Sequence, residues 1–217
     1  MKNVKRLQKP EILRNHAAKW KKELMNKIRE CRKNNRKVPN SYYNKYNQDD
    51  VLDTLKRMYT GLCCYCESRI EPVSFPNIEH LKPKQIFPEY AFEWDNLHLA
   101  CEKCNTYKKN KYDNKHPILD PVNDKPISKH LYYETYRIMP RPDSKRGQTT
   151  IAHTQLNRDD LFDIRKTIFF YAWEVIEKIR NNPSDAGNPE RIKKLKEMCT
   201  GEHGSLIENM MKVCSIP

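Results

Sequence analysis

The sequence lacks any long run of apolar residues. None of its 217 residues falls in a stretch of about 18 or more apolar side chains, so it offers no candidate for a transmembrane helix. Its first residues are polar and basic, without the apolar segment of a signal peptide. We also find no internal repeat and no low-complexity tract. These absences favour a globular protein of the cytoplasm.

Acidic residues are scarce at the start of the chain. Residues 1–37 hold 14 Lys/Arg against 3 Asp/Glu, a net charge of +11, and the remaining residues contribute only +2 to the total of +13. A basic arm on a nearly neutral body indicates a polyanionic partner such as nucleic acid. The alternative is a solvated helix face that keeps the protein in solution.

Eight cysteines are present, and four of them form two Cys-x-x-Cys pairs: Cys63 with Cys66, and Cys101 with Cys104. In a reducing cytoplasm such pairs are better interpreted as metal ligands than as disulfides. Four thiolates in a tetrahedron are a typical structural zinc site, closed to catalysis. Cys64 leaves a second register open, but Cys63 matches the spacing of the other pair.

The N-terminal region is predicted to be helical and basic. Apolar residues recur at spacings of three and four over 11–35, which predicts one helix with an apolar stripe. Residues 36–47, rich in Asn and Tyr, are predicted to be a loop. A second helix is expected over 48–60, with Asn47 as its N-cap and Gly61 after its end.

The region between the cysteine pairs is too long for a simple zinc ribbon, whose pairs are usually about 15–20 residues apart. We expect short strands at Ile78–His80 and Leu97–Ala100, separated by a proline-containing loop, and then a lysine-rich helix over 105–113. His98 is expected on the outer face of its strand, either as a phosphate ligand or as a polar surface residue. The expected order is strand, loop, strand, helix.

The C-terminal region begins with prolines around a β-like segment, His130–Met139, predicted to be a two-stranded ribbon or an irregular wrap. Helices are expected from about 149 and again near 189–200 and 204–214. The first has a broad apolar stripe, predicted to be buried, which comprises Leu161, Ile164, Ile168, Tyr171, Val175 and Ile179 and is widened by Phe162, Phe169 and Ile176. The predicted class is α+β, mostly helical, with a zinc-stapled core. The predicted regions are a basic helical part, a core, and a wrap followed by helices, at 1–60, 61–115 and 116–217.

Four polar residues of the core have the chemistry of phosphodiester hydrolysis, which needs a base for water and a cation for the phosphate oxygens. His80 suits the base, because imidazole can accept a proton near neutral pH. Glu79 and Asn105 offer hard oxygen donors for Mg²⁺ or Mn²⁺. Asn96 is expected to bond across the loop and hold this geometry.

Three lysines flank the candidate site and are candidates for contact with nucleic-acid phosphates: Lys82, Lys84 and Lys108. Exposed lysines are common in loops, so a purely solvated role is the alternative for each of them.

The series Cys-x-x-Cys, Ile-Glu-His, Asn-Leu and Cys-x-x-Cys-Asn-x-x-Lys resembles the HNH (ββα-metal) nucleases, in the variant that ends in Asn. That resemblance implies that His80 is the general base, that Asn96 orients its loop, and that Glu79 and Asn105 bind the catalytic metal. Glu79 stands where the family usually has Asp, which keeps the carboxylate but lengthens its reach.

The likeness extends to Glu79–Lys84, to Leu119-Asp120-Pro121 and to residues 150–165, which are similar to the PtuB nucleases of the Septu anti-phage system, also found with some retrons. It implies a PtuA-type ATPase partner and, in a retron, a reverse transcriptase with its DNA. The expected function is a metal-dependent endonuclease of an anti-phage complex. The alternative is a non-catalytic zinc-stapled module that binds nucleic acid or acts as an adaptor.

Overall fold

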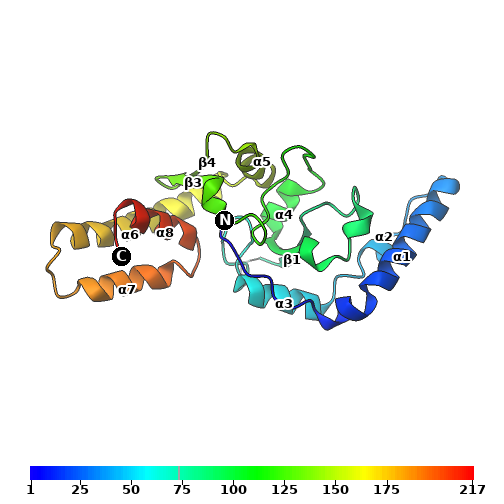
Figure 1. Cartoon of the computed structure of the whole chain (residues 1–217), viewed down its shortest axis with the longest axis horizontal. Helices are drawn as coiled ribbons and strands as arrows, with labels where there is room; N and C mark the ends of the chain where they lie inside the picture. Colours follow the sequence, from blue (N-terminus) through cyan, green and yellow to red (C-terminus); the bar gives the residue numbers. More distant parts are fainter. Residues whose placement is uncertain (73) are drawn as a thin grey trace. The chain divides into compact units, whose positions relative to one another are not determined.

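The computed structural model describes residues 1–72 and 74–217, which form two compact units (Figure 1). The N-terminal unit comprises Val4–Cys64 and Ile70–Lys115. The C-terminal unit comprises Met1–Asn3, Tyr65–Arg69 and His116–Pro217. About half of the residues lie in helices, and the strands form two small antiparallel pairs. The predicted α+β, mostly helical class is confirmed, and the three-part division of the chain stays a prediction.

Helix α1 (Glu11–Lys33) confirms the first predicted helix. Its apolar stripe is buried, and the helix packs within its own unit against α2 (Asn40–Tyr43), α3 (Asp49–Tyr59) and the 3-10 helix η1 (Pro88–Tyr90). The stripe therefore belongs to the core of the N-terminal unit. The prediction of an uninterrupted loop over 36–47 was wrong, because α2 interrupts it with one helical turn.

The cap predicted for α3 was wrong by one residue. Gln48, in extended conformation, is the N-cap, and its side chain makes no capping bond. Asn47 instead donates its backbone N–H to the carbonyl of Asn44, so it belongs to the preceding turn. At the other end, Thr60 and Gly61 both have positive φ angles, 51° and 73°, which ends the helix in the left-handed region.

The core of the N-terminal unit has the predicted order of strand, loop, strand and helix. Strand β1 (Pro76–His80) pairs with β2 (Leu97–Cys101) in antiparallel register, with Glu79 opposite His98. Helix α4 (Glu102–Lys108) follows directly. It begins three residues before the predicted position because the Cys101 side chain caps it, accepting from the Cys104 amide.

The expected outward orientation of His98 was wrong. Its side chain is fully buried, with Nδ1 2.6 Å from the hydroxyl of Tyr59. Burial, reinforced by the positive charge of Arg6, lowers the pKa of His98 well below its ordinary value. Helix α3 covers this face of the strand, which the sequence of β2 alone does not reveal.

The C-terminal unit consists of a hairpin and four helices. The predicted ribbon is a hairpin of β3 (Leu131–Glu134) and β4 (Arg137–Pro140), preceded by the 3-10 helix η3 (Ile127–Lys129). Its helices follow in chain order: α5 (Lys145–Thr154), α6 (Asp159–Asn181), α7 (Asn188–Met198) and α8 (Gly204–Val213). Of the helices described, none combines the length and the apolar content needed to cross a bilayer.

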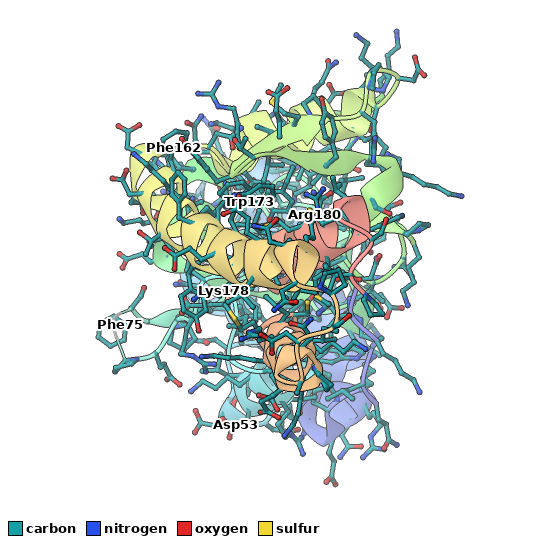
Figure 2. The ribbon with its side chains drawn as sticks, turned by 90° about the vertical axis from the view of Figure 1, so that its left-hand side faces the viewer. Asp53, Phe75, Phe162, Trp173, Lys178 and Arg180 are labelled. Carbon is teal, nitrogen blue, oxygen red and sulfur yellow. The ribbon has the colours of Figure 1, made fainter. Side chains whose placement is uncertain are left out.

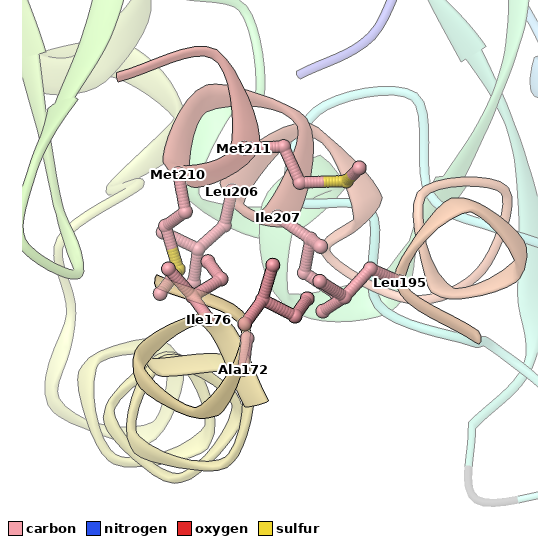
Figure 3. Packing of buried hydrophobic residues seen from close by; sticks show 8 residues of the cluster. Ala172, Ile176, Leu195, Leu206, Ile207, Met210 and Met211 are labelled. Carbon is pink, nitrogen blue, oxygen red and sulfur yellow. The ribbon is translucent and has the colours of Figure 1, made fainter. Parts of the chain in front are cut away.

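The last three helices share one apolar core, shown in Figure 3. Ala172 and Ile176 of α6 meet Leu195 of α7 and the buried face of α8, which includes Leu206 and Met210. Aromatic side chains of α6 also contact the hairpin; Phe162, labelled in Figure 2, packs edge to face on Tyr136 with ring centroids 4.7 Å apart. The hairpin and α6 are thus joined by aromatic contacts.

The apolar stripe predicted for α6 is buried at Leu161, Ile176 and Ile179, but the prediction was wrong at two of its positions. Ile164 is 43% exposed and Tyr171 is 40% exposed, whereas Arg165, one position along, is fully buried. The Arg165 guanidinium donates to the carbonyl of Leu156 at 2.6 Å. The buried side of α6 thus includes a charged residue that its apolar pattern alone does not predict.

Candidate active site

The four cysteines of the two Cys-x-x-Cys pairs meet in space. The Sγ atoms of Cys63, Cys66, Cys101 and Cys104 all lie within 4.8 Å of one another, and all four side chains are buried. Zinc bound to four thiolates at about 2.3 Å places the sulfurs roughly 3.8 Å apart. The donor set and its spacing fit a structural zinc ion. Cys64 is outside the cluster, and its amide donates to the Leu99 carbonyl at 2.8 Å.

His80 ends strand β1 and is almost completely buried. Its Nε2 lies 2.9 Å from the carbonyl oxygen of Ala91, and its ring stands edge to face on Tyr46 at 4.4 Å. A carbonyl oxygen only accepts hydrogen bonds, so Nε2 carries the proton and Nδ1 keeps its lone pair. Burial lowers the pKa of His80 to about 3, which leaves the imidazole neutral at physiological pH.

Asn96 ties the loop between the strands together. Its side-chain oxygen accepts from the Lys82 amide at 2.7 Å. Its side-chain nitrogen donates to the carbonyls of Lys82 at 3.0 Å and Tyr90 at 3.1 Å. The three bonds connect the residues after His80 with the residues before Ala91, so Asn96 holds both sides of the segment that accepts the imidazole N–H.

Glu79 and Lys108 form a buried ion pair. The Lys108 Nζ contacts the Glu79 carboxylate and donates to the His80 carbonyl at 2.6 Å, and only 1% of the Lys108 side chain and 4% of the Glu79 side chain are exposed. Lys108 thus connects α4 to the end of β1. Asn105 lies one turn earlier on α4 and is half-buried.

The other two lysines differ in their surroundings. The Lys84 Nζ lies 2.5 Å from the Tyr46 hydroxyl, and desolvation lowers its pKa to about 8 against the opposing effect of Glu79. The Lys82 ammonium stands over the ring of Tyr90, 3.9 Å from its centroid. Contact of these lysines with phosphate stays a prediction.

Tyr46 is a site residue that sequence reasoning missed. It is buried, packs on His80 and bonds Lys84. Burial, followed by the negative charge of Glu79, raises the pKa of Tyr46 to about 12, which keeps its hydroxyl protonated. Three tyrosines in an otherwise polar segment were the available signal, because large rings in a polar loop often pack on a nearby site.

The donor chemistry at β1 and α4 fits a hard divalent cation. Glu79 offers a carboxylate, and Asn105 offers an amide oxygen on the adjoining helix. Among residues 1–72 and 74–217, no group of three His, Cys, Asp or Glu side chains other than the four cysteines comes together. One protein carboxylate suits Mg²⁺, which binds through one or two carboxylates and takes its remaining ligands from water and substrate phosphates.

Comparison with known proteins agrees with this geometry. A family model described as HNH endonuclease matches residues 63–111, which contain both cysteine pairs, both strands of the first sheet and α4. The Septu protein PtuB of Bacillus mycoides (strain KBAB4) is 30% identical over 154 residues, covering 57% of this chain and 52% of that protein. The Septu protein PtuB of Bacillus thuringiensis is 32% identical over 127 residues, covering 58% and 48%.

The chain thus spans about half the length of these curated relatives. The resemblance to HNH nucleases expected from the motifs is confirmed. Residues 63–111 match the HNH endonuclease family model, in a chain similar to the Septu proteins PtuB.

Proposed function

We propose that this protein is a metal-dependent HNH endonuclease that hydrolyses phosphodiester bonds in nucleic acid. The observation that carries the proposal is the state of His80, a neutral imidazole whose Nε2 is bonded to the Ala91 carbonyl and whose Nδ1 keeps a lone pair. Such a side chain can accept a proton from water.

Each residue around His80 has a part in the proposed reaction. His80 Nδ1 accepts the proton of the attacking water, and the Ala91 carbonyl stabilises the imidazolium that forms. Asn96 holds the loop that presents Ala91. The approaching phosphate is negatively charged, which raises the pKa of His80 from its value in the free protein and makes it a better base.

Glu79 and Asn105 are the proposed ligands of the catalytic metal. Bound there, Mg²⁺ or Mn²⁺ would stabilise negative charge on the phosphate oxygens and the leaving oxygen. Lys82 and Lys84 are proposed to contact flanking phosphates. Lys108, as the buried partner of Glu79, is proposed to contact substrate only if its ion pair opens.

The test is cleavage of DNA and RNA by the purified chain with Mg²⁺ or Mn²⁺, compared with His80→Ala. Loss of one general base costs about 10²–10⁴-fold in rate. Zinc content and melting temperature, measured in parallel, show whether the variant is folded. If a folded, zinc-loaded His80→Ala protein cuts at the wild-type rate, His80 is not the base and the proposal fails.

We further propose that the chain acts in an anti-phage complex with a PtuA-type ATPase. The support is its similarity to two proteins named Septu protein PtuB. Co-expression and co-purification with a PtuA-type ATPase from the same source tests the partnership. Recovery of a reverse transcriptase with its DNA would indicate a retron context.

A four-thiolate zinc site needs reduced cysteines, which supports the cytoplasm as the compartment.

A non-catalytic module that binds nucleic acid is the second candidate, and one observation favours it. The Glu79 carboxylate already has a cationic partner in Lys108, so a metal must compete with that pair or use the other carboxylate oxygen. This candidate predicts tight binding of nucleic acid, with no metal-dependent cleavage by the wild type under any of the conditions above.

A further inference from the structure

The solvent face of α1 carries a row of basic side chains. Lys22, Arg29 and Lys33 are all exposed, and among the ion pairs of the described residues none includes any of the three. A helix turns by about 100° per residue, so these three residues lie within about 40° of one another on the helix surface. They form one line, which we call the basic row.

The basic row lies opposite the buried side of the helix. Leu24, Ile28 and Cys31 are buried, and they are rotated by roughly 180–240° from Lys22. The apolar stripe fixes which side of α1 faces its own unit, and this in turn fixes the row toward solvent. Because the buried stripe holds α1 in one orientation about its axis, the basic row keeps facing solvent.

The acidic side chains within and near α1 are largely neutralised by other lysines. Lys27 bonds Glu30 at 2.9 Å, and Lys45 pairs with Glu23. Lys21 of α1 pairs with Glu93, which lies outside the helix, at 3.0 Å. The positive charge of the basic row is therefore not cancelled locally, and α1 adds Arg14, Lys19 and Arg32 as further exposed cations.

Helix α1 is also joined to the segment that positions His80. Trp20 packs edge to face on Phe92 at 5.8 Å, and Lys21 pairs with Glu93. Phe92 follows Ala91, whose carbonyl accepts the His80 N–H. A nucleic acid bound along α1 would therefore contact the same unit that holds His80. The segment with Ala91, Phe92 and Glu93 contacts both α1 and His80.

We propose that the basic row of α1 binds the phosphodiester backbone of nucleic acid and extends the contact made at the HNH site. The row from Lys22 to Lys33 is about 16 Å long, at 1.5 Å per residue. Measured along a duplex axis, that length corresponds to about five nucleotides of each strand, at 3.4 Å per nucleotide. Lysine and arginine contacts to phosphate carry no base recognition, so this surface supplies affinity and orientation rather than sequence specificity.

This inference rests on the proposed nuclease function for its choice of partner, but its test does not use cleavage. The full chain carries His80→Ala in every sample, and no divalent metal is added. Binding of a labelled DNA duplex and of the RNA duplex of the same sequence is measured by fluorescence anisotropy across a salt series. A failure of the nuclease proposal would leave these measurements unaffected.

The test variant changes Lys22, Arg29 and Lys33 to Gln, which removes charge while keeping a good helix former. Each phosphate contact contributes about 0.9 to the slope of log K against log salt, so three lost contacts reduce the slope by about 2.7 and the affinity roughly 500-fold at about 0.1 M salt. The matched control changes three exposed cations of the C-terminal unit to Gln: Lys178, Arg180 (both labelled in Figure 2) and Lys196.

The proposal holds if the test variant loses slope and affinity while the control keeps the wild-type slope. It is overturned if the test variant binds either duplex like the wild type, or if the control loses as much. Vesicles containing phosphatidylserine test an anionic membrane as the partner; loss of vesicle binding with unchanged duplex binding also overturns it. If the triple variant does not fold, the three single substitutions are measured, each expected to lower the slope by about 0.9.

Discussion

Replacing Lys108 with methionine should destabilise the protein strongly, and divalent metal should reverse part of that loss. Methionine keeps most of the length of the side chain but removes the ammonium that contacts the Glu79 carboxylate and donates to the His80 carbonyl. Both partners are almost inaccessible to water. Breaking a buried pair by removing one member typically costs about 3–5 kcal/mol, because the other charge stays buried without compensation.

For a chain of this length, 1 kcal/mol corresponds to about 2–4 °C in Tm. We therefore expect Lys108→Met to lower the Tm by roughly 6–20 °C without added metal. Addition of Mg²⁺ or Mn²⁺ should raise the Tm of the variant more than that of the wild type, because the ion supplies the missing positive charge beside Glu79. Differential scanning calorimetry with and without metal measures both effects.

Lys56→Met is the matched control. Lys56 pairs with Glu71 at 2.9 Å on the surface, where such a pair is worth about 0–1 kcal/mol. It should melt close to the wild type and show the wild-type response to metal. The reasoning is refuted if Lys108→Met melts like Lys56→Met. If instead it is destabilised but metal stabilises it no more than the wild type, Glu79 does not bind the ion.

Two further predictions concern the zinc cluster and the pH response. Cys104→Ser should lose bound zinc, measured by elemental analysis, and should melt at a much lower temperature than Cys214→Ser. The control substitution Cys214→Ser leaves the four-cysteine cluster intact. Equal zinc content in the two variants would contradict the zinc assignment. The pKa of His80 is about 3 in the folded state, below the ordinary value of 6.5. Below about pH 6.5 the unfolded state therefore binds a proton that the folded state does not. The free energy of unfolding then decreases as the pH drops toward 3. At pH 5 the burial of neutral His80 lowers the free energy of unfolding by roughly 2 kcal/mol. The urea midpoints at pH 7 and pH 5 should therefore differ less in His80→Gln than in the wild type. Equal differences in the two proteins would show that His80 is not buried as a neutral imidazole.

Much of the candidate site could be predicted from residues close together in sequence. The two Cys-x-x-Cys pairs, with the strands and α4 around them, depend on local spacing and capping, and the structure brings the four cysteines within 4.8 Å of one another. The preference for Cys63 over Cys64 also agrees with the cluster, because matched spacing gives both turns the same geometry. The roles of His80 and Asn96 stay predictions, although their hydrogen bonds are now known.

Contacts between distant segments were beyond the reach of sequence patterns. Tyr46 reaches His80 from a loop 34 positions earlier, and Tyr59 covers His98. Lys108, a candidate for phosphate contact, has protein partners on β1 that its position in the sequence does not reveal. No local pattern distinguishes a lysine that meets solvent from one that meets a carboxylate 29 positions away.

The sequence by itself determined the zinc ligands' spacing, the order of the core elements, the amphipathic α1 and the basic character of the first 37 residues, because each depends on neighbours along the chain. Only the tertiary structure decided which face of a helix or strand is buried when polar groups compete with apolar ones. Arg165 is buried in α6 while Ile164 is exposed, and Glu79 is buried with Lys108. The physical reason is that the Leu156 carbonyl and the Lys108 ammonium stabilise these buried groups, and such partners meet them only when the chain has folded.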